Sequence, residues 1–230
     1  MEENLTPSEE IQDTAPQAPE ATRPEATQKP KKSVKELAAG YFTATRMAYM
    51  ALFTALSFVL YLPWLEFYII PAVPYLKVDF SNTFVLIAGF SLGPVAGVIV
   101  GVLKELIHAF SFSSTGGVGE IANILVTLPF VLIPSIGYKY KKGIKWVLSF
   151  IGVGCIVQVL WSFPVNWLLN FPVFVGFNWQ VGMATYIKVW YWAMLFNLVK
   201  CLLISAATLL LYKNISRLIK YTSLKFDRKK

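Results

Sequence analysis

Six long apolar stretches, almost free of charged residues, constrain the fold of this chain more than any other feature. About 20 apolar residues in a helix are needed to cross the ~30 Å hydrocarbon core of a bilayer. The sequence is 56% hydrophobic and only 15% charged, whereas about 25% of a soluble domain is charged. The pattern therefore predicts an all-α, polytopic membrane protein with six transmembrane helices, at residues 44–62, 80–92, 95–110, 120–138, 146–169 and 186–212.

The stretches and their connections differ in character. The second stretch is short for a full crossing, so we expect a tilted or protein-buried helix. Pro164 predicts a kink in the fifth stretch. The connection 63–79 contains Pro63, Pro71 and Pro74 among aromatic residues, so we expect a helix-free segment at the membrane surface. The uncharged link 170–185 is expected to form a second, lid-like outer loop.

The chain divides into a membrane domain and two tails. Seven acidic residues precede Lys29, with only Arg23 against them, in a segment rich in Pro, Thr and Ala. Such a segment cannot bury enough apolar surface to fold, and it lacks the apolar core of a signal peptide. We expect a disordered cytoplasmic tail at residues 1–40, a six-helix membrane domain at 41–213 and a basic cytoplasmic tail at 214–230.

Basic residues are concentrated in every second connection. They precede the first stretch, separate the fourth from the fifth and follow the sixth, whereas the other three connections contain only Lys77. The positive-inside rule then places both termini in the cytoplasm. The net charge of +8 is accounted for by these topology signals and by contacts with membrane lipids, so we expect no nucleic-acid partner.

Small residues recur at helical spacing in two of the stretches. Gly93, Gly97 and Gly101 open the third stretch, and Ala51 and Ala55 lie in the first. Small residues four positions apart allow helix backbones to approach closely in lipid. The two stripes serve either packing within the bundle or docking of another protein's helices.

Polar residues interrupt the third and fourth stretches. Lys104, Glu105 and His108 close the third, and Glu120 and Asn123 open the fourth. Glu105 and His108 have the spacing of a di-iron ligand pair, but the second copy that such a site requires is missing, so no metal is expected. Glu120 either suits the helix N-terminus electrostatically or makes a polar contact in an outward-facing pocket. The glycine-rich segment 114–119 lacks the Gly-Lys-Ser/Thr ending of a P-loop, so no ATP site is expected.

A lysine in the sixth stretch is the hardest residue to explain as structure. The charge of Lys200 requires a carboxylate, carbonyl groups or a polar ligand at membrane depth. Asn197 lies on the same helix face, and Asn166 of the fifth stretch can converge on the pair. Two amides and one cation among aromatic residues suit a small, planar, hydroxylated ligand. Cys155 and Cys201 lie singly in different stretches and are expected to be buried thiols.

Four separated motifs resemble, in order, the substrate-binding S components of energy-coupling factor (ECF) transporters, and most closely their riboflavin-specific type. These motifs are Pro74-Tyr-Leu-Lys-Val-Asp-Phe-Ser81, Gly89-Phe-Ser-Leu-Gly-Pro94, Ser114-Thr-Gly-Gly-Val-Gly-Glu120 with Ala122-Asn123, and Phe196-Asn-Leu-Val-Lys200.

The resemblance implies a protein of the bacterial cell membrane that captures riboflavin from outside. The resemblance also implies that the protein then topples in the membrane when it is paired with a transmembrane coupling subunit and two ATPases. It places Ala51 and Ala55 at the coupling subunit, with the glycine stripe as a further docking candidate. The substrate-binding residues expected on these grounds are Asn197, Lys200, Asn166, Glu120, Asn123, Lys77 and Asp79. No cofactor is expected, because riboflavin is the transported ligand and ATP is used only by the partner subunits.

Three other functions remain open at this point. The same fold could bind another vitamin, such as pantothenate. An intramembrane enzyme could use Glu105, His108 and Glu120, although no nucleophile with a base partner is visible. If the protein were a purely structural membrane partner, the free-energy cost of placing the charge of Lys200 at membrane depth would have no explanation.

Overall fold

The computed structural model describes residues 41–70, 76–141 and 143–227 of the chain. The expected disordered tail at 1–40, and Pro71 and Pro74 of the first connection, lie outside these ranges. In order, the elements are α2 (Ala44–Val59), η1 (Pro63–Leu65), β1 (Phe67–Tyr68), β2 (Lys77–Val78), α3 (Asn82–Leu92), α4 (Pro94–Phe112), α5 (Val118–Tyr140), α6 (Ile144–Val165), η2 (Asn166–Asn170), α7 (Phe171–Phe174) and α8 (Trp179–Asp227).

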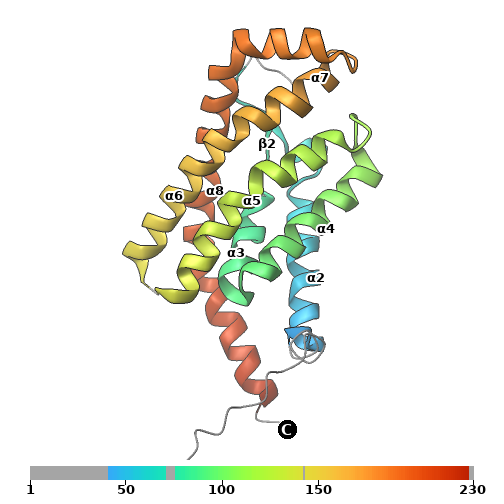
Figure 1. Cartoon of the computed structure of the whole chain (residues 1–230). Coiled ribbons are helices and arrows are strands. Elements are labelled where there is room, and N and C mark those ends of the chain that lie inside the picture. The colour runs from blue at the N-terminus through green and yellow to red at the C-terminus, as the bar shows by residue number, and fades with distance from the viewer. Residues whose placement is uncertain (1–40, 71–75, 142, 228–230) are drawn as a thin grey trace, which may run out of the picture.

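The molecule is a bundle of helices in which successive helices run alternately up and down (Figure 1). Among the described residues, four helical segments are long and apolar enough to cross a bilayer: Pro94–Phe112, Val118–Tyr140, Ile144–Phe174 and Trp179–Tyr212. The first turn of α2 and the last turns of α8 lie at one end of the molecule, and the 113–117 loop and α7 lie at the other. We call the latter the loop end.

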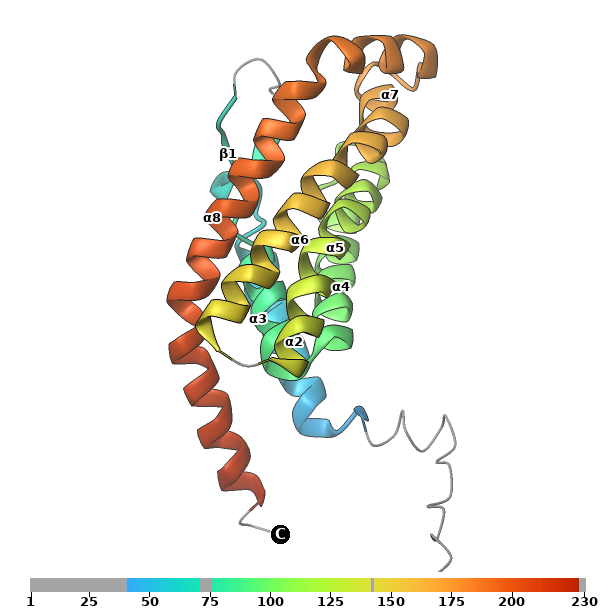
Figure 2. The same ribbon diagram turned by 60° about the vertical axis from the view of Figure 1, so that its left-hand side comes forward.

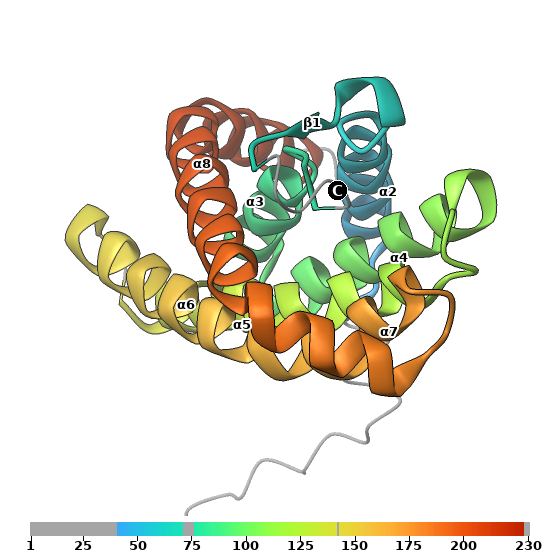
Figure 3. The same ribbon diagram turned by 90° about the horizontal axis from the view of Figure 1, so that it is seen from above.

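Helix α3 is the buried centre of the bundle. It has 11 residues, a length of about 16 Å, and nine of them, from Asn82 to Leu92, are buried. Seen from above, α3 lies between α2 and α8 (Figure 3). The expectation of a short, protein-buried second helix is therefore confirmed.

The glycine stripe serves packing between α3 and α4. Gly93 adopts a φ of 103° and forms the turn between the two helices. A Cβ on Gly97 would lie 2.9 Å from Gly89 Cα, and a Cβ on Gly101 would lie 3.2 Å from a Val85 methyl group. Gly97 is buried, so its assignment to an exposed docking surface is wrong, because the close approach of α3 occupies that face.

The alanine stripe of α2 has the opposite environment. Ala51 and Ala55 are both exposed, whereas Phe53, Thr54 and Ser57 on the other face are buried. Packing against the described residues therefore does not account for the alanines.

The first connection contains a feature that the all-α prediction missed. Strands β1 and β2 pair antiparallel, with Phe67 opposite Val78 and Tyr68 opposite Lys77. The one-turn helix η1 begins at Pro63, which is tolerated in a first turn because no intrahelical bond is lost there. Val78 is fully buried, so this two-stranded ribbon is anchored on the bundle.

The expected outer loop at 170–185 is wrong for most of its length. The chain stays helical through a π-helical segment at Asn166–Asn170 and through α7, and α8 begins at Trp179 (Figure 2). Pro172 near the start of α7 has no N–H to donate, and Trp179 Nε1 instead donates to the carbonyl of Leu168, four residues before the proline, at 3.1 Å. A Cβ on Gly182 would lie 2.5 Å from Pro172 Cα, so this glycine permits α7 and α8 to pack backbone to backbone.

Candidate functional site

A cavity of about 350 Å³ opens among the first connection, α4, α5, η2 and α8. Its volume falls in the range of about 300–1,000 Å³ that is usual for small-molecule sites. Its lining includes loop-end residues such as Pro63, Thr115 and Phe174. All seven residues that sequence analysis assigned to substrate binding line this one cavity: Lys77, Asp79, Glu120, Asn123, Asn166, Asn197 and Lys200.

Lys200 of α8 finds a carboxylate partner inside the chain. Its Nζ donates to Asp79 Oδ2 at 2.9 Å, across 121 positions of sequence. The side chain of Lys200 is 7% exposed and that of Asp79 is 2% exposed, so the pair is shielded from water. Sequence analysis had predicted both residues in the site, but had not predicted that they pair. The ion pair satisfies part of the charge of Lys200 and still borders the cavity.

The Lys200–Asp79 pair belongs to a longer polar chain. Both the backbone N–H and the hydroxyl of Ser81 donate to Asp79 Oδ1. Lys104 Nζ donates to Ser81 Oγ at 2.5 Å and lies 2.9 Å from Glu105 Oε1. Two ammonium groups and two carboxylates are thus buried together, with equal numbers of each sign. Glu105 also accepts from Asn123 Nδ2 of α5, which links α8, α4 and α5 through one set of contacts.

The two predicted asparagines flank the cavity from neighbouring helices. Asn166 begins η2, and its Nδ2 donates to Ser162 O at 2.8 Å. Asn197 Nδ2 donates to Ala193 O, one turn earlier in α8, at 2.9 Å. Both side chains are nearly fully buried. An amide has two donor hydrogens and an oxygen with two acceptor sites, so each retains capacity to bind a ligand.

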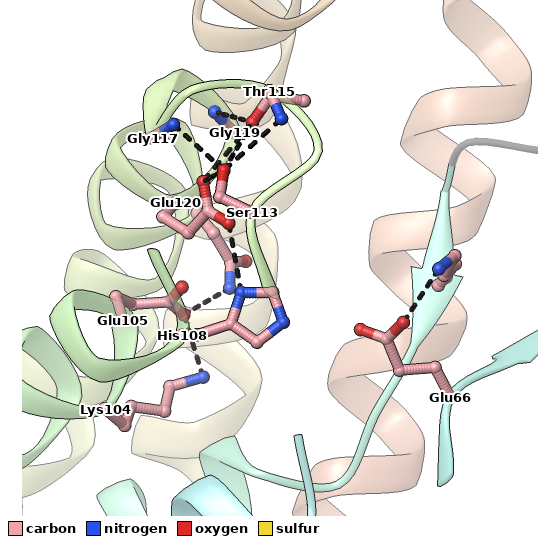
Figure 4. A network of polar contacts seen from close by, with 11 residues as sticks. Glu66, Lys104, Glu105, His108, Ser113, Thr115, Gly117, Gly119 and Glu120 are labelled. Carbon is pink, nitrogen blue, oxygen red and sulfur yellow. Dashed lines mark hydrogen bonds and ion pairs between the residues drawn. The ribbon is translucent and has the colours of Figure 1, made fainter. Parts of the chain in front are cut away.

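Glu120 has a position that is compatible with both of the roles that the sequence suggested. It lies in the first turn of α5 and also lines the cavity. Its Oε1 lies 3.0 Å from His108 Nδ1, and its Oε2 accepts from Ser113 Oγ at 3.0 Å and from Thr115 Oγ1 at 3.3 Å (Figure 4). The carboxylate therefore ties the 113–117 loop to the end of α4.

Lys77 forms the most exposed of the ion pairs among the described residues of the site. Its Nζ donates to Glu66 Oε2 at 3.0 Å, and its side chain is 38% exposed. The hydrogen bond to the Glu66 carboxylate raises the pKa of Lys77 above its usual value. The pair ties β2 to the segment preceding β1 at the cavity edge.

Glu66, Tyr61 and Ser81 are among the contributors to the cavity and its polar chain that were not expected from the sequence. Glu66 and Tyr61 line the cavity, and Ser81 connects Asp79 with Lys104. The ring of Tyr61 stacks on His108 with 3.9 Å between centroids, and Lys104 Nζ lies 4.5 Å from the Tyr61 centroid. Only the position of Ser81 within the resemblance motif offered a signal for any of them.

The chain is similar to known transporter proteins over most of its length. Residues 45–212 match the family described as "ECF transporter, substrate-specific component". The riboflavin transporter RibU of Staphylococcus aureus is 32% identical over 178 residues, which cover 76% of this chain and 92% of that protein. The riboflavin transporter FmnP of Bacillus subtilis is 27% identical over 135 residues, covering 57% and 70% of the two chains.

A solved structure shares this fold. It is described as "Structure and mechanism of the S component of a bacterial ECF transporter", and it superposes with a TM-score of 0.63 at 30% sequence identity. The match covers 76% of this chain and 97% of that chain. From the family match, the identity with RibU and the shared fold, we conclude that this chain belongs to the substrate-specific components, or S components, of ECF transporters.

Proposed function

We propose that this chain is the riboflavin-binding S component of an ECF transporter and that riboflavin occupies the cavity. The observation that carries the proposal is the convergence of Lys77, Asp79, Glu120, Asn123, Asn166, Asn197 and Lys200 on a single cavity of about 350 Å³. The names of the relatives, riboflavin transporters in S. aureus and B. subtilis, support the choice of vitamin.

The chemistry of the cavity suits riboflavin. The vitamin combines a flat ring system, which carries carbonyl and N–H groups along one edge, with a chain of hydroxyl groups. Asn166 and Asn197 supply both donors and acceptors, and Lys200 supplies charge-assisted donors. Phe196 of α8 lines the same cavity and offers an apolar ring face. The cavity binds the vitamin without a cofactor, and ATP is used only by partner subunits.

The exposed face of α2 provides the contact with the rest of the transporter. The partners are a transmembrane coupling subunit and two ATPases. Ala51 and Ala55 are exposed, and their small side chains permit close approach of a partner helix in lipid. This face is separate from the cavity, since neither alanine lines it.

The chain crosses the bacterial cell membrane six times, with both termini in the cytoplasm. Six passes consist of α2, α3, α4, α5, α6 with α7, and α8, although α2 and α3 are shorter than a full span. The α5–α6 connection carries Lys139, Lys141 and Lys145 and lies at the same end as the first turn of α2 (Figure 1). The loop end then faces outward, with tails at 1–40 and 214–230 on the inner side of a membrane domain at 41–213.

Enzymatic use of Glu105, His108 and Glu120 is not favoured. The relatives are transporter components and not enzymes. Glu105 is paired with Lys104, and His108 is paired with Glu120.

The absorption spectrum of the chain, purified alone from riboflavin-supplied cells, tests the proposal. We expect a flavin spectrum with about one flavin per chain, and riboflavin binding that an excess of pantothenate leaves unchanged. A protein that purifies without flavin, does not bind added riboflavin, or binds pantothenate in competition would contradict the proposed substrate.

A further inference from the structure

His108 is a buried histidine whose ring is held on two sides. Its Nδ1 lies 3.0 Å from Glu120 Oε1, and its ring stacks on Tyr61 with planes 21° apart. The residue is 8% exposed and lines the cavity. In Figure 4 its second ring nitrogen points away from Glu120. Within the described residues this atom, Nε2, has no hydrogen-bond partner.

The pairing with Glu120 determines what Nε2 can do. A carboxylate accepts hydrogen bonds, so Nδ1 carries the hydrogen and Nε2 of the neutral ring carries a lone pair. Turning the ring over would break the contact between Nδ1 and Glu120. The unpaired acceptor is therefore fixed in position on a buried side chain that lines the cavity, and a hydroxyl group is a suitable donor to it.

We propose that His108 is a further ligand-binding residue, whose Nε2 accepts a hydrogen bond from a hydroxyl group on the ribityl chain of riboflavin. The inference rests on the proposed function, since it takes riboflavin as the ligand. In Figure 3, α4 and α8 lie on opposite sides of α3. His108 and the Asn197–Lys200 pair therefore contact different parts of the ligand. Glu120 acts as a positioning residue that fixes the tautomer and orientation of the ring.

A purely structural role is the competing explanation. His108 could serve only to hold Glu120, which in turn accepts from Ser113 and Thr115 of the 113–117 loop. The two explanations assign importance to different ring nitrogens. Nδ1 matters in the structural role, and Nε2 matters in ligand binding.

Two substitutions separate the two nitrogens. The amide nitrogen of asparagine can take the place of Nδ1 and donate to Glu120, but the side chain is too short to reach the place of Nε2. Glutamine reaches the place of Nε2 and loses the position of Nδ1. His108→Asn therefore removes the proposed ligand contact, whereas His108→Gln keeps a polar group there.

Riboflavin affinity, measured by quenching of flavin fluorescence on the purified chain, gives the test. We expect His108→Asn to weaken binding about tenfold to hundredfold, as for one lost buried hydrogen bond, and His108→Gln to stay within about threefold of the parent. Lumiflavin, which has a methyl group in place of the ribityl chain, should bind parent and His108→Asn equally. Equal lumiflavin binding also shows that the variant is folded.

Three results would overturn the assignment. These are parent-like riboflavin affinity of His108→Asn, a larger loss for His108→Gln than for His108→Asn, and an equal loss of lumiflavin and riboflavin affinity in His108→Asn. If His108→Asn binds like the parent while Asn197→Ala is weakened, only the His108 assignment fails. A parent chain that binds no riboflavin overturns the proposed function as well.

Discussion

The buried ion pair between Lys200 and Asp79 makes a quantitative prediction about stability. Asp79→Asn leaves the ammonium groups of Lys200 and Lys104 with only the Glu105 carboxylate. Lys200→Met leaves two carboxylates with one ammonium group. Each single variant therefore buries one unbalanced charge, whereas the double variant restores equal numbers of both signs.

The expected magnitudes follow from this charge balance. Removing one partner of a buried pair costs about 3–5 kcal/mol, because the other charge stays out of water without compensation. At about 2–4 °C per kcal/mol for a chain of this size, each single variant should unfold about 6–20 °C below the parent. The double variant should lose less than either single variant, since a neutral replacement of a buried pair is often well tolerated.

Thermal unfolding in detergent can be followed with a thiol-reactive fluorogenic dye, because Cys155 and Cys201 are both free and buried until the chain unfolds. Lys188→Met on the exposed side of α8 is the matched control and should leave the unfolding temperature within about 2 °C of the parent, because isolated surface charges contribute little. Additive losses in the double variant, or single variants as stable as the control, would refute the ion pair.

Three further predictions concern topology, docking and packing. A membrane-impermeant thiol reagent added to intact cells should label Thr115→Cys and not Lys141→Cys, because the loop end faces outward. The opposite labelling pattern would show that the chain has the reverse orientation in the membrane. Ala51→Leu and Ala55→Leu should block uptake while leaving riboflavin affinity within about twofold of the parent, because the alanines lie outside the cavity. Equal losses of affinity and uptake would show that the alanines do not form a docking face. Gly97→Val should lower the unfolding temperature by several degrees. The new Cβ would lie 2.9 Å from Gly89 Cα, and overpacking typically costs about 1–3 kcal/mol. Unchanged stability would contradict the close packing of α3 and α4.

Hydropathy located the helices of this protein well, because a bilayer requires long apolar runs wherever the chain crosses it. The described helices begin and end within a few residues of the expected stretches between residues 44 and 165. The hydropathy pattern could not distinguish a loop from a short helix in the uncharged link 170–185. Pro172 and Gly182 there suggested a break, but they serve the contact between α7 and α8.

The partners of individual side chains were less accessible to sequence reasoning. The unusual position of Lys200 showed that it needed a partner, but the partner, Asp79, lies 121 positions away, and no local pattern encodes such a contact. The glycine and alanine stripes have the same spacing, yet Gly97 is buried and Ala51 is exposed. Which helix faces lie inside the bundle depends on the tertiary arrangement, which spacing alone does not specify.

His108 illustrates the same limit within the site. In the sequence it was considered as a metal ligand and as part of an enzyme site. The structure adds that one ring nitrogen contacts Glu120 and that the other has no partner among the described residues. Only the surroundings of the two ring nitrogens, taken together, suggest that His108 has a role in ligand binding.

A riboflavin titration of the parent chain beside Asn197→Ala tests the central claim most directly. Gln180→Ala is the control on the same helix, because Gln180 is exposed and does not line the cavity. The account predicts saturable quenching with one site per chain, a loss of about tenfold to hundredfold in affinity for Asn197→Ala, and parent-like binding for Gln180→Ala. Parent-like affinity of a normally folded Asn197→Ala would contradict the placement of riboflavin in this cavity, and the absence of binding by the parent would contradict riboflavin as the ligand.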